Sequence, residues 1–124
     1  MDRVQNLLHT KWPAILWSVI IFLLLAMPSS GLETRTLIKI PGFDKLVHFV
    51  LFAVYSFLWY RYAGAVKTTG NKALVIIIGS GCLFGIAMEF VQLHPWVNRD
   101  FEWGDMVADS LGAGIIFLIR KRKN

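Results

Sequence analysis

The chain has little of what several common protein classes require. It contains a single cysteine, which rules out an intramolecular disulfide, and we interpret Cys82 as a small packing residue because it lies in an apolar run. It has no glycine-rich nucleotide loop, which argues against ATP-driven chemistry. Neither a zinc-finger spacing nor a repeat of basic and aromatic residues is present, and the basic residues behind the net charge of +5 flank hydrophobic segments instead of forming a patch. We therefore predict no nucleic-acid partner.

Charge is also missing from long stretches of the chain. Trp12 to Met27, Ala73 to Met88 and Ser110 to Ile119 contain no charged residue. Hydrophobic residues make up 56% of the sequence and its mean hydropathy is +0.55, above the usual balance of a soluble protein. A length of 124 residues fits one domain. These features predict a single-domain membrane protein surrounded by a lipid bilayer.

We predict an all-α integral membrane protein, a four-transmembrane-helix bundle formed by the single domain 1–124. The predicted helices cover residues 12–28, 43–62, 73–93 and 103–119. The second has about 20 residues, which span roughly 30 Å of hydrocarbon at the helical rise. A cleaved signal peptide is the alternative for the first helix. We favour a retained span because Pro28 lies in the cleavage zone and the remaining chain is itself strongly hydrophobic.

The two predicted sides of the membrane differ in charge. The N-terminus, the turn between the second and third helices and the C-terminal tail together hold nine of the 13 Lys and Arg residues and one of the 8 Asp and Glu residues. Basic segments remain in the cytoplasm when membrane helices insert. We therefore predict that both termini are cytoplasmic and that the loops 29–42 and 94–102 face the extracytoplasmic side.

Ionisable residues lie inside or at the ends of these apolar runs. His48 follows Asp44 by one helical turn, and Asp109 follows Asp105 by the same spacing. Glu89 lies near the end of the third helix, so His48, Glu89 and Asp109 should share a depth of about one turn, roughly 6 Å. Ionisable groups within a span are costly and by default indicate a function. A structural polar network is the alternative.

We assign provisional roles to eight residues. The candidate catalytic residues are His48, Glu89 and Asp109, and the candidate ligand-binding residues are Asp44, Lys45, Gln92, Arg99 and Asp105. Asp44 and Asp105 also fit helix caps or first-turn acids favoured by the helix dipole. Arg99 either pairs with Asp105 and Asp109 or grips a phosphate or carboxylate with its guanidinium fork.

The charge around this predicted site is unbalanced. Six acids face two bases if all are ionised, and the set consists of Asp44, Glu89, Asp100, Glu102, Asp105 and Asp109 against Lys45 and Arg99. Protonation of some carboxylates, a bound cation or a cationic group on a ligand would each relieve the excess. His48 with two or three carboxylates is a plausible set for a divalent cation, although no H-x-x-x-H or H-E-x-x-H spacing supports one. The metal and any other cofactor stay open.

An ordered set of short motifs resembles the VanZ-like family. The set consists of Asp44-Lys45-x-x-His48-Phe49 with Tyr55, then Glu89-x-x-Gln92, then Arg99, Asp105 and Asp109-x-x-Gly112. The family commonly has asparagine where this chain has Asp109, which adds a negative charge here. The resemblance implies a bacterial cytoplasmic (inner) membrane protein whose namesake is associated with resistance to teicoplanin and related lipoglycopeptides.

Three classes of function follow from these observations. The first is a binding or resistance module that recognises a glycopeptide, a lipid or a peptidoglycan precursor. The second is a small membrane enzyme that acts on a lipid head group or wall precursor by acid/base or metal-assisted chemistry. The third is a transporter or proton relay, which we disfavour because the inner halves of the predicted spans lack ionisable residues. Small-residue faces such as Gly81-x-x-x-Gly85 permit close helix packing and self-association to an oligomer.

Overall fold

The computed structural model describes residues 2–27, 42–68, 70–95 and 103–122, and its regular structure is entirely α-helical within these ranges. The helices are α1 (Asp2–Leu8), α2 (Trp12–Leu25), α4 (Phe43–Ala65), α5 (Asn71–Gln92) and α6 (Trp103–Arg122). The predicted all-α architecture is therefore confirmed. The short α1 was not predicted, because its mixed polar sequence lacks an apolar run.

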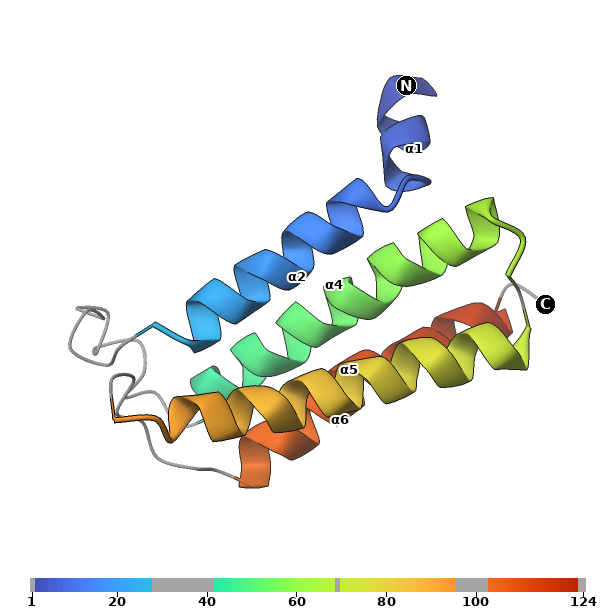
Figure 1. Ribbon diagram of the computed structural model, residues 1–124. Helices are drawn as coiled ribbons and strands as arrows, with labels where there is room; N and C mark the ends of the chain where they lie inside the picture. The colour runs from blue at the N-terminus through green and yellow to red at the C-terminus, as the bar shows by residue number, and fades with distance from the viewer. Residues whose placement is uncertain (1, 28–41, 69, 96–102, 123–124) are drawn as a thin grey trace.

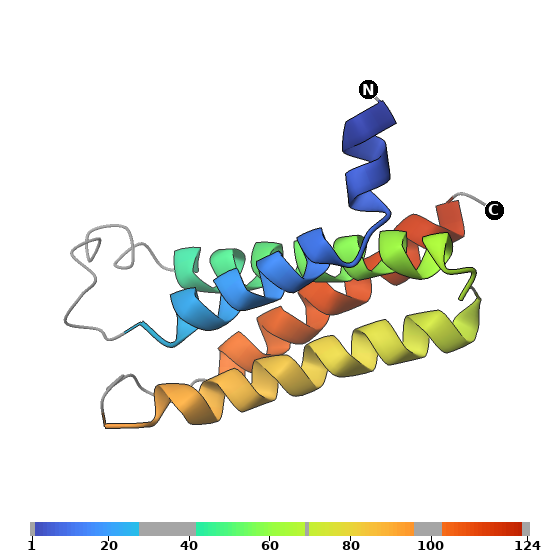
Figure 2. The same ribbon diagram turned by 45° about the horizontal axis from the view of Figure 1, so that its top comes forward.

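Four of the helices lie side by side, while α1 projects away from them (Figures 1 and 2). α4 contacts each of the other described helices, and its closest association is with α6. The start of α2 and the end of α6 lie at the same end of the bundle as the turn from α4 to α5 (Figure 1). The opposite end of the bundle therefore gathers the last turns of α2 and α5 and the first turns of α4 and α6.

Among the described residues, two helices have both the length and the composition to cross a membrane, where four were predicted. They are α4, with 23 residues, and α5, with 22. α2 has 14 residues, which reach roughly 21 Å against a hydrocarbon thickness of roughly 30 Å. α6 has 20 residues but includes Asp105, Asp109 and Arg120, which lower its hydropathy. The prediction of four spans is thus not confirmed, although α4 and α5 have the length and composition that it requires.

The bundle has an apolar exterior and several polar groups inside. Val75 and Leu83 on α5 are 70% and 69% exposed, and Phe90 and Leu111 are also exposed. In contrast, His48, Ser56, Glu89, Gln92, Asp105 and Asp109 are buried. Large contiguous apolar surfaces are unusual on soluble monomers, whereas a bundle in lipid presents them all around.

The apolar core lies in the middle of the bundle, around the fully buried Phe52 of α4. Ile21 and Leu25 of α2 and Met88 of α5 belong to the same cluster of buried side chains. The ring of Phe52 meets that of Phe84 edge to face, with centroids 5.7 Å apart. This core holds three helices against α4 and leaves the polar groups on either side of it along the bundle.

Candidate functional site

The first turns of α4 and α6 bring the site together. α4 begins after Gly42, whose φ of 81° is a conformation that glycine adopts readily, and Asp44 lies in its first turn, where the helix dipole favours a negative charge. Both helices start at the same end of the bundle and run in the same direction (Figure 1). Residues one turn inside each helix therefore meet at the same level, and these residues are His48 and Asp109.

His48 and Asp109 form a buried pair. Nδ1 of His48 lies 2.8 Å from Oδ1 of Asp109, and both residues are only 1% exposed. Because an ionised carboxylate can only accept a hydrogen bond, the proton of this contact belongs to Nδ1. Asp109 thus fixes the orientation of the imidazole and with it the position of the other ring nitrogen, Nε2.

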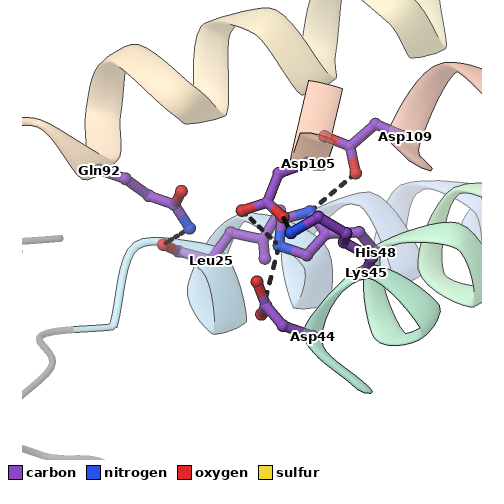
Figure 3. Close-up of polar contacts among 7 residues, drawn as sticks. All are labelled: Leu25, Asp44, Lys45, His48, Gln92, Asp105 and Asp109. Carbon is purple, nitrogen blue, oxygen red and sulfur yellow. Dashed lines mark hydrogen bonds and ion pairs between the residues drawn. The ribbon is translucent and has the colours of Figure 1, made fainter. Parts of the chain in front are cut away.

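Two further carboxylates face the Nε2 atom of His48 (Figure 3). Oδ2 of Asp105 lies at 3.7 Å and Oδ1 of Asp44 at 3.8 Å, both beyond hydrogen-bond distance. Asp105 is buried, whereas the side chain of Asp44 is 40% exposed. The imidazole is therefore enclosed by carboxylates on both of its nitrogen-bearing edges.

Lys45 supplies a positive charge at the edge of this cluster. Its Nζ lies 3.7 Å from Oδ1 of Asp105, and its side chain is about half exposed. Gly104 of α6 makes room for it, since a Cβ there would overlap the Lys45 side chain. Asp105 thus faces Lys45 with one oxygen and His48 with the other.

Glu89 reaches the cluster from α5 and is fully buried. One ligand atom from each of His48, Glu89 and Asp109 lies within 4.8 Å of the others, and the same holds for Asp44, His48 and Asp105. Gly85, one turn before Glu89, allows this approach because a Cβ at that position would lie 2.7 Å from Cβ of Asp109. Oδ2 of Asp109 is buried with no hydrogen-bond partner in the described part of the chain.

Gln92, a predicted ligand-binding residue, contacts α2 instead of the cluster. The buried Gln92 donates from Nε2 to the carbonyl oxygen of Leu25, at 3.0 Å, and so satisfies one of the last carbonyls of α2 (Figure 3). Arg99, together with Asp100 and Glu102, lies outside the described residues, so its predicted roles stay predictions. The cluster therefore consists of Asp44, Lys45, His48, Glu89, Asp105 and Asp109, and we refer to it as the His48 cluster.

Sequence reasoning missed a second polar level two turns further along α4. There Ser56 donates to the carbonyl oxygen of Ala113 at 2.8 Å, and the hydroxyl of Tyr55 lies 2.9 Å from that of Ser80. Serine is common in apolar helices and does not stand out in one. The available signal was the position of Ser56 eight residues after His48, roughly on the same helical face.

The described residues define a small helical protein with two helices of membrane-spanning length and a buried ionisable cluster among α4, α5 and α6. No family of known proteins and no solved structure matches the chain. A segment of 48 residues is 40% identical to the fluoride-specific ion channel FluC of Hydrogenovibrio crunogenus. The match covers 36% of this chain and 36% of that protein, so the likeness is confined to a little over a third of each.

These comparisons contradict the resemblance to the VanZ-like family. No family matches, and the curated protein that does match is a channel. The predicted glycopeptide resistance and the predicted recognition of a lipid or wall precursor are therefore wrong, and the alternative of a membrane enzyme is not supported either. The physical reason is that each motif is short. An acid and a histidine four residues apart, or an acid at a helix start, recur wherever helices are capped and packed.

Proposed function

We propose that this chain is a small membrane protein that binds and passes ions, and that the His48 cluster is its ion-binding site. One observation carries the proposal: His48, Glu89 and Asp109 are buried together on three helices of an apolar bundle. Buried ionisable groups are costly in such surroundings and characteristically mark the ion pathways of membrane proteins. The partial likeness to an ion channel supports the same class of function.

A cation is the ion that the charges favour. The His48 cluster contains four carboxylates against one lysine and one histidine, so it is negative overall unless protons or a cation compensate it. An anion entering this space would meet like charges at short range in a medium of low dielectric. Carboxylate oxygens and an imidazole nitrogen are, in contrast, ordinary ligands for cations.

Fluoride is the second candidate, because the matched protein is a fluoride-specific channel. Fluoride would need a positive or hydrogen-bond-donating surface, and Lys45 at the edge of the cluster is the described group of that kind closest to it. The two candidates therefore make opposite demands on the carboxylates. Neutralising Asp109 removes a negative charge, which weakens the binding of a cation but lowers the repulsion of an anion.

Passage through a single chain is obstructed beside the cluster. Phe52 follows His48 by one turn, is fully buried, and belongs to the apolar core that lies between the His48 cluster and the level of Ser56 along α4. Ion passage therefore requires either movement of this ring or a route along an interface between copies of the chain. A Phe52→Ala variant should increase flux if the route runs through one bundle and leave it unchanged if the route lies between copies.

The proposal is tested with the purified full chain reconstituted in liposomes. Entry of Mn²⁺ is followed by quenching of an internal dye, entry of K⁺ and H⁺ by suitable indicators, and loss of fluoride by an ion-selective electrode. We expect flux of a cation that Asp109→Asn lowers by at least tenfold and that Ser56→Ala, the control in the same helix interface, leaves intact. If the liposomes lose fluoride, and Asp109→Asn preserves or increases this loss, the transported ion is fluoride instead of a cation. Absence of any flux above that of empty liposomes would overturn the proposal.

A further inference from the structure

We infer that His48, Asp44 and Asp105 bind a divalent transition-metal ion, with Asp109 as the residue that positions the histidine. This inference rests on the proposed function and names the class of ion and the ligand atoms. The ligand atoms are Nε2 of His48, Oδ1 of Asp44 and Oδ2 of Asp105. Zn²⁺, Mn²⁺ and Co²⁺ belong to the class that accepts one imidazole with carboxylates.

The distances around Nε2 of His48 suit a shared cation better than direct contact. The two facing carboxylate oxygens lie 3.7 and 3.8 Å away, too far for hydrogen bonds. Metal bonds of about 2.0–2.2 Å at a tetrahedral angle separate neighbouring ligand atoms by roughly 3.3–3.6 Å. The two separations from Nε2 are thus within a few tenths of an ångström of those around one ion, and one ligand atom from each of the three residues lies within 4.8 Å of the others.

The tautomer of His48 gives an independent reason. In the neutral imidazole with its proton on Nδ1, Nε2 presents a lone pair that faces two carboxylates, which are also electron donors (Figure 3). Such an arrangement is repulsive unless a cation lies among the three groups or Nε2 is protonated. The alternative to a metal is therefore an imidazolium held by three acids.

Asp109 supplies the outer contact that metal-bound histidines usually have. A ligating histidine commonly donates its second N–H to a carboxylate, which fixes the ring and strengthens the metal bond. The 2.8 Å contact from Nδ1 to Asp109 has this form. Oδ2 of Asp109 is buried without a hydrogen-bond partner among the described residues, so a positive charge bound at Nε2 of the ring would also stabilise this carboxylate.

Co²⁺ titration of the full chain in detergent micelles tests the inference, because bound Co²⁺ has visible absorption bands that report its ligands. We expect one Co²⁺ per chain, displaced by Zn²⁺. Asp44→Asn and Asp105→Asn should each weaken binding at least tenfold, and His48→Gln should abolish it. Asp109→Asn should weaken binding by about 10–100-fold and shift the absorption bands while one ion per chain still binds. Ser56→Ala should leave the titration unchanged, and circular dichroism confirms that each variant keeps its helices.

Three results would overturn the inference. The first is that the folded wild-type chain does not bind Co²⁺ at millimolar concentration. The second is that binding survives His48→Gln. The third is that Glu89→Gln weakens binding more than Asp44→Asn does, which would place the ion on the other side of the imidazole ring. The proposed function is tested separately. Saturable Co²⁺ binding without any ion flux in liposomes would support the metal site and reject the transport role. Flux of K⁺ or H⁺ without Co²⁺ binding would support the transport role and reject the metal site.

Discussion

Two levels of the α4–α6 interface contain buried polar groups, and they differ in kind. At the level of Ser56, a neutral hydroxyl is matched to the carbonyl oxygen of Ala113 at 2.8 Å. At the level of His48, charged groups from three helices gather, and Oδ2 of Asp109 has no hydrogen-bond partner in the described ranges. A neutral satisfied pair needs only the fold to explain it. A charged cluster in which one carboxylate oxygen has no hydrogen-bond partner needs a further explanation, and we propose that it binds an ion.

The largest expected effect comes from breaking the charged level. His48→Ala leaves the buried Asp109 without its hydrogen-bond donor, and removal of one partner of a buried charged group typically costs about 3–5 kcal/mol. We expect a loss of unfolding free energy of this size, measured by denaturant titration in micelles. Adding Asp109→Ala to the same chain should recover part of the loss, because it removes the stranded charge. A loss of under about 1 kcal/mol in the single variant would mean that His48 is not an electrostatic partner.

Overpacking the contact between the two helices should have the next largest effect. A Cβ at Gly112 would overlap the backbone carbonyl oxygen of Phe49, which has no flexible end to move aside. Gly112→Ala should therefore destabilise the chain by about 1–3 kcal/mol and disturb both levels together. Gly114→Ala is the matched control, since nothing lies within 4 Å of a Cβ there. Equal melting temperatures for the two variants would show that α4 and α6 do not approach as described.

Removing the hydrogen bond at the level of Ser56 should lower the free energy of unfolding by a smaller amount and should leave ion binding unchanged. Ser56→Ala removes one buried hydroxyl donor and leaves the Ala113 carbonyl in its helix, so we expect a loss of about 1 kcal/mol. Ion binding should stay at the wild-type level. If Ser56→Ala lowered cation affinity as much as Asp109→Asn, the two levels would belong to one site and the comparison would fail.

The smallest effect concerns the edge of the cluster. Lys45 lies 3.7 Å from Asp105 with its side chain about half exposed, so it competes weakly with a bound cation. Lys45→Met should raise cation affinity by up to roughly fivefold, because an exposed ion pair contributes at most about 1 kcal/mol. The gain should shrink at high salt, where exposed charges are screened. A loss of affinity in this variant would instead make Lys45 part of an anion site.

The helices were largely predictable from the sequence, because apolar runs and glycine or proline boundaries are local signals. The predicted ranges 43–62, 73–93 and 103–119 correspond to α4 (Phe43–Ala65), α5 (Asn71–Gln92) and α6 (Trp103–Arg122). The predicted range 12–28 corresponds to α2 (Trp12–Leu25), which is shorter than a span. Apolar composition alone did not indicate where that helix would end.

The site was predictable in part. The meeting of His48, Glu89 and Asp109 followed from their equal depth on helices that alternate in direction. The partner of Gln92 could not be predicted, because an amide N–H can donate to any nearby carbonyl oxygen. The carbonyl oxygen of Leu25 is available to it only because α2 ends at that residue. The resemblance to the VanZ-like family was wrong because motifs of four residues describe helix ends and helix contacts in general.

The difference between the two levels is tested most directly by the thermal unfolding midpoint of the full chain with and without a divalent cation. A ligand that binds only the folded state raises that midpoint. We predict that Zn²⁺ raises the midpoint of the wild type and of Ser56→Ala equally, and that Asp109→Asn loses most of the increase. No increase in the wild type, or an equal increase in Asp109→Asn, would contradict the assignment of an ion to the His48 cluster.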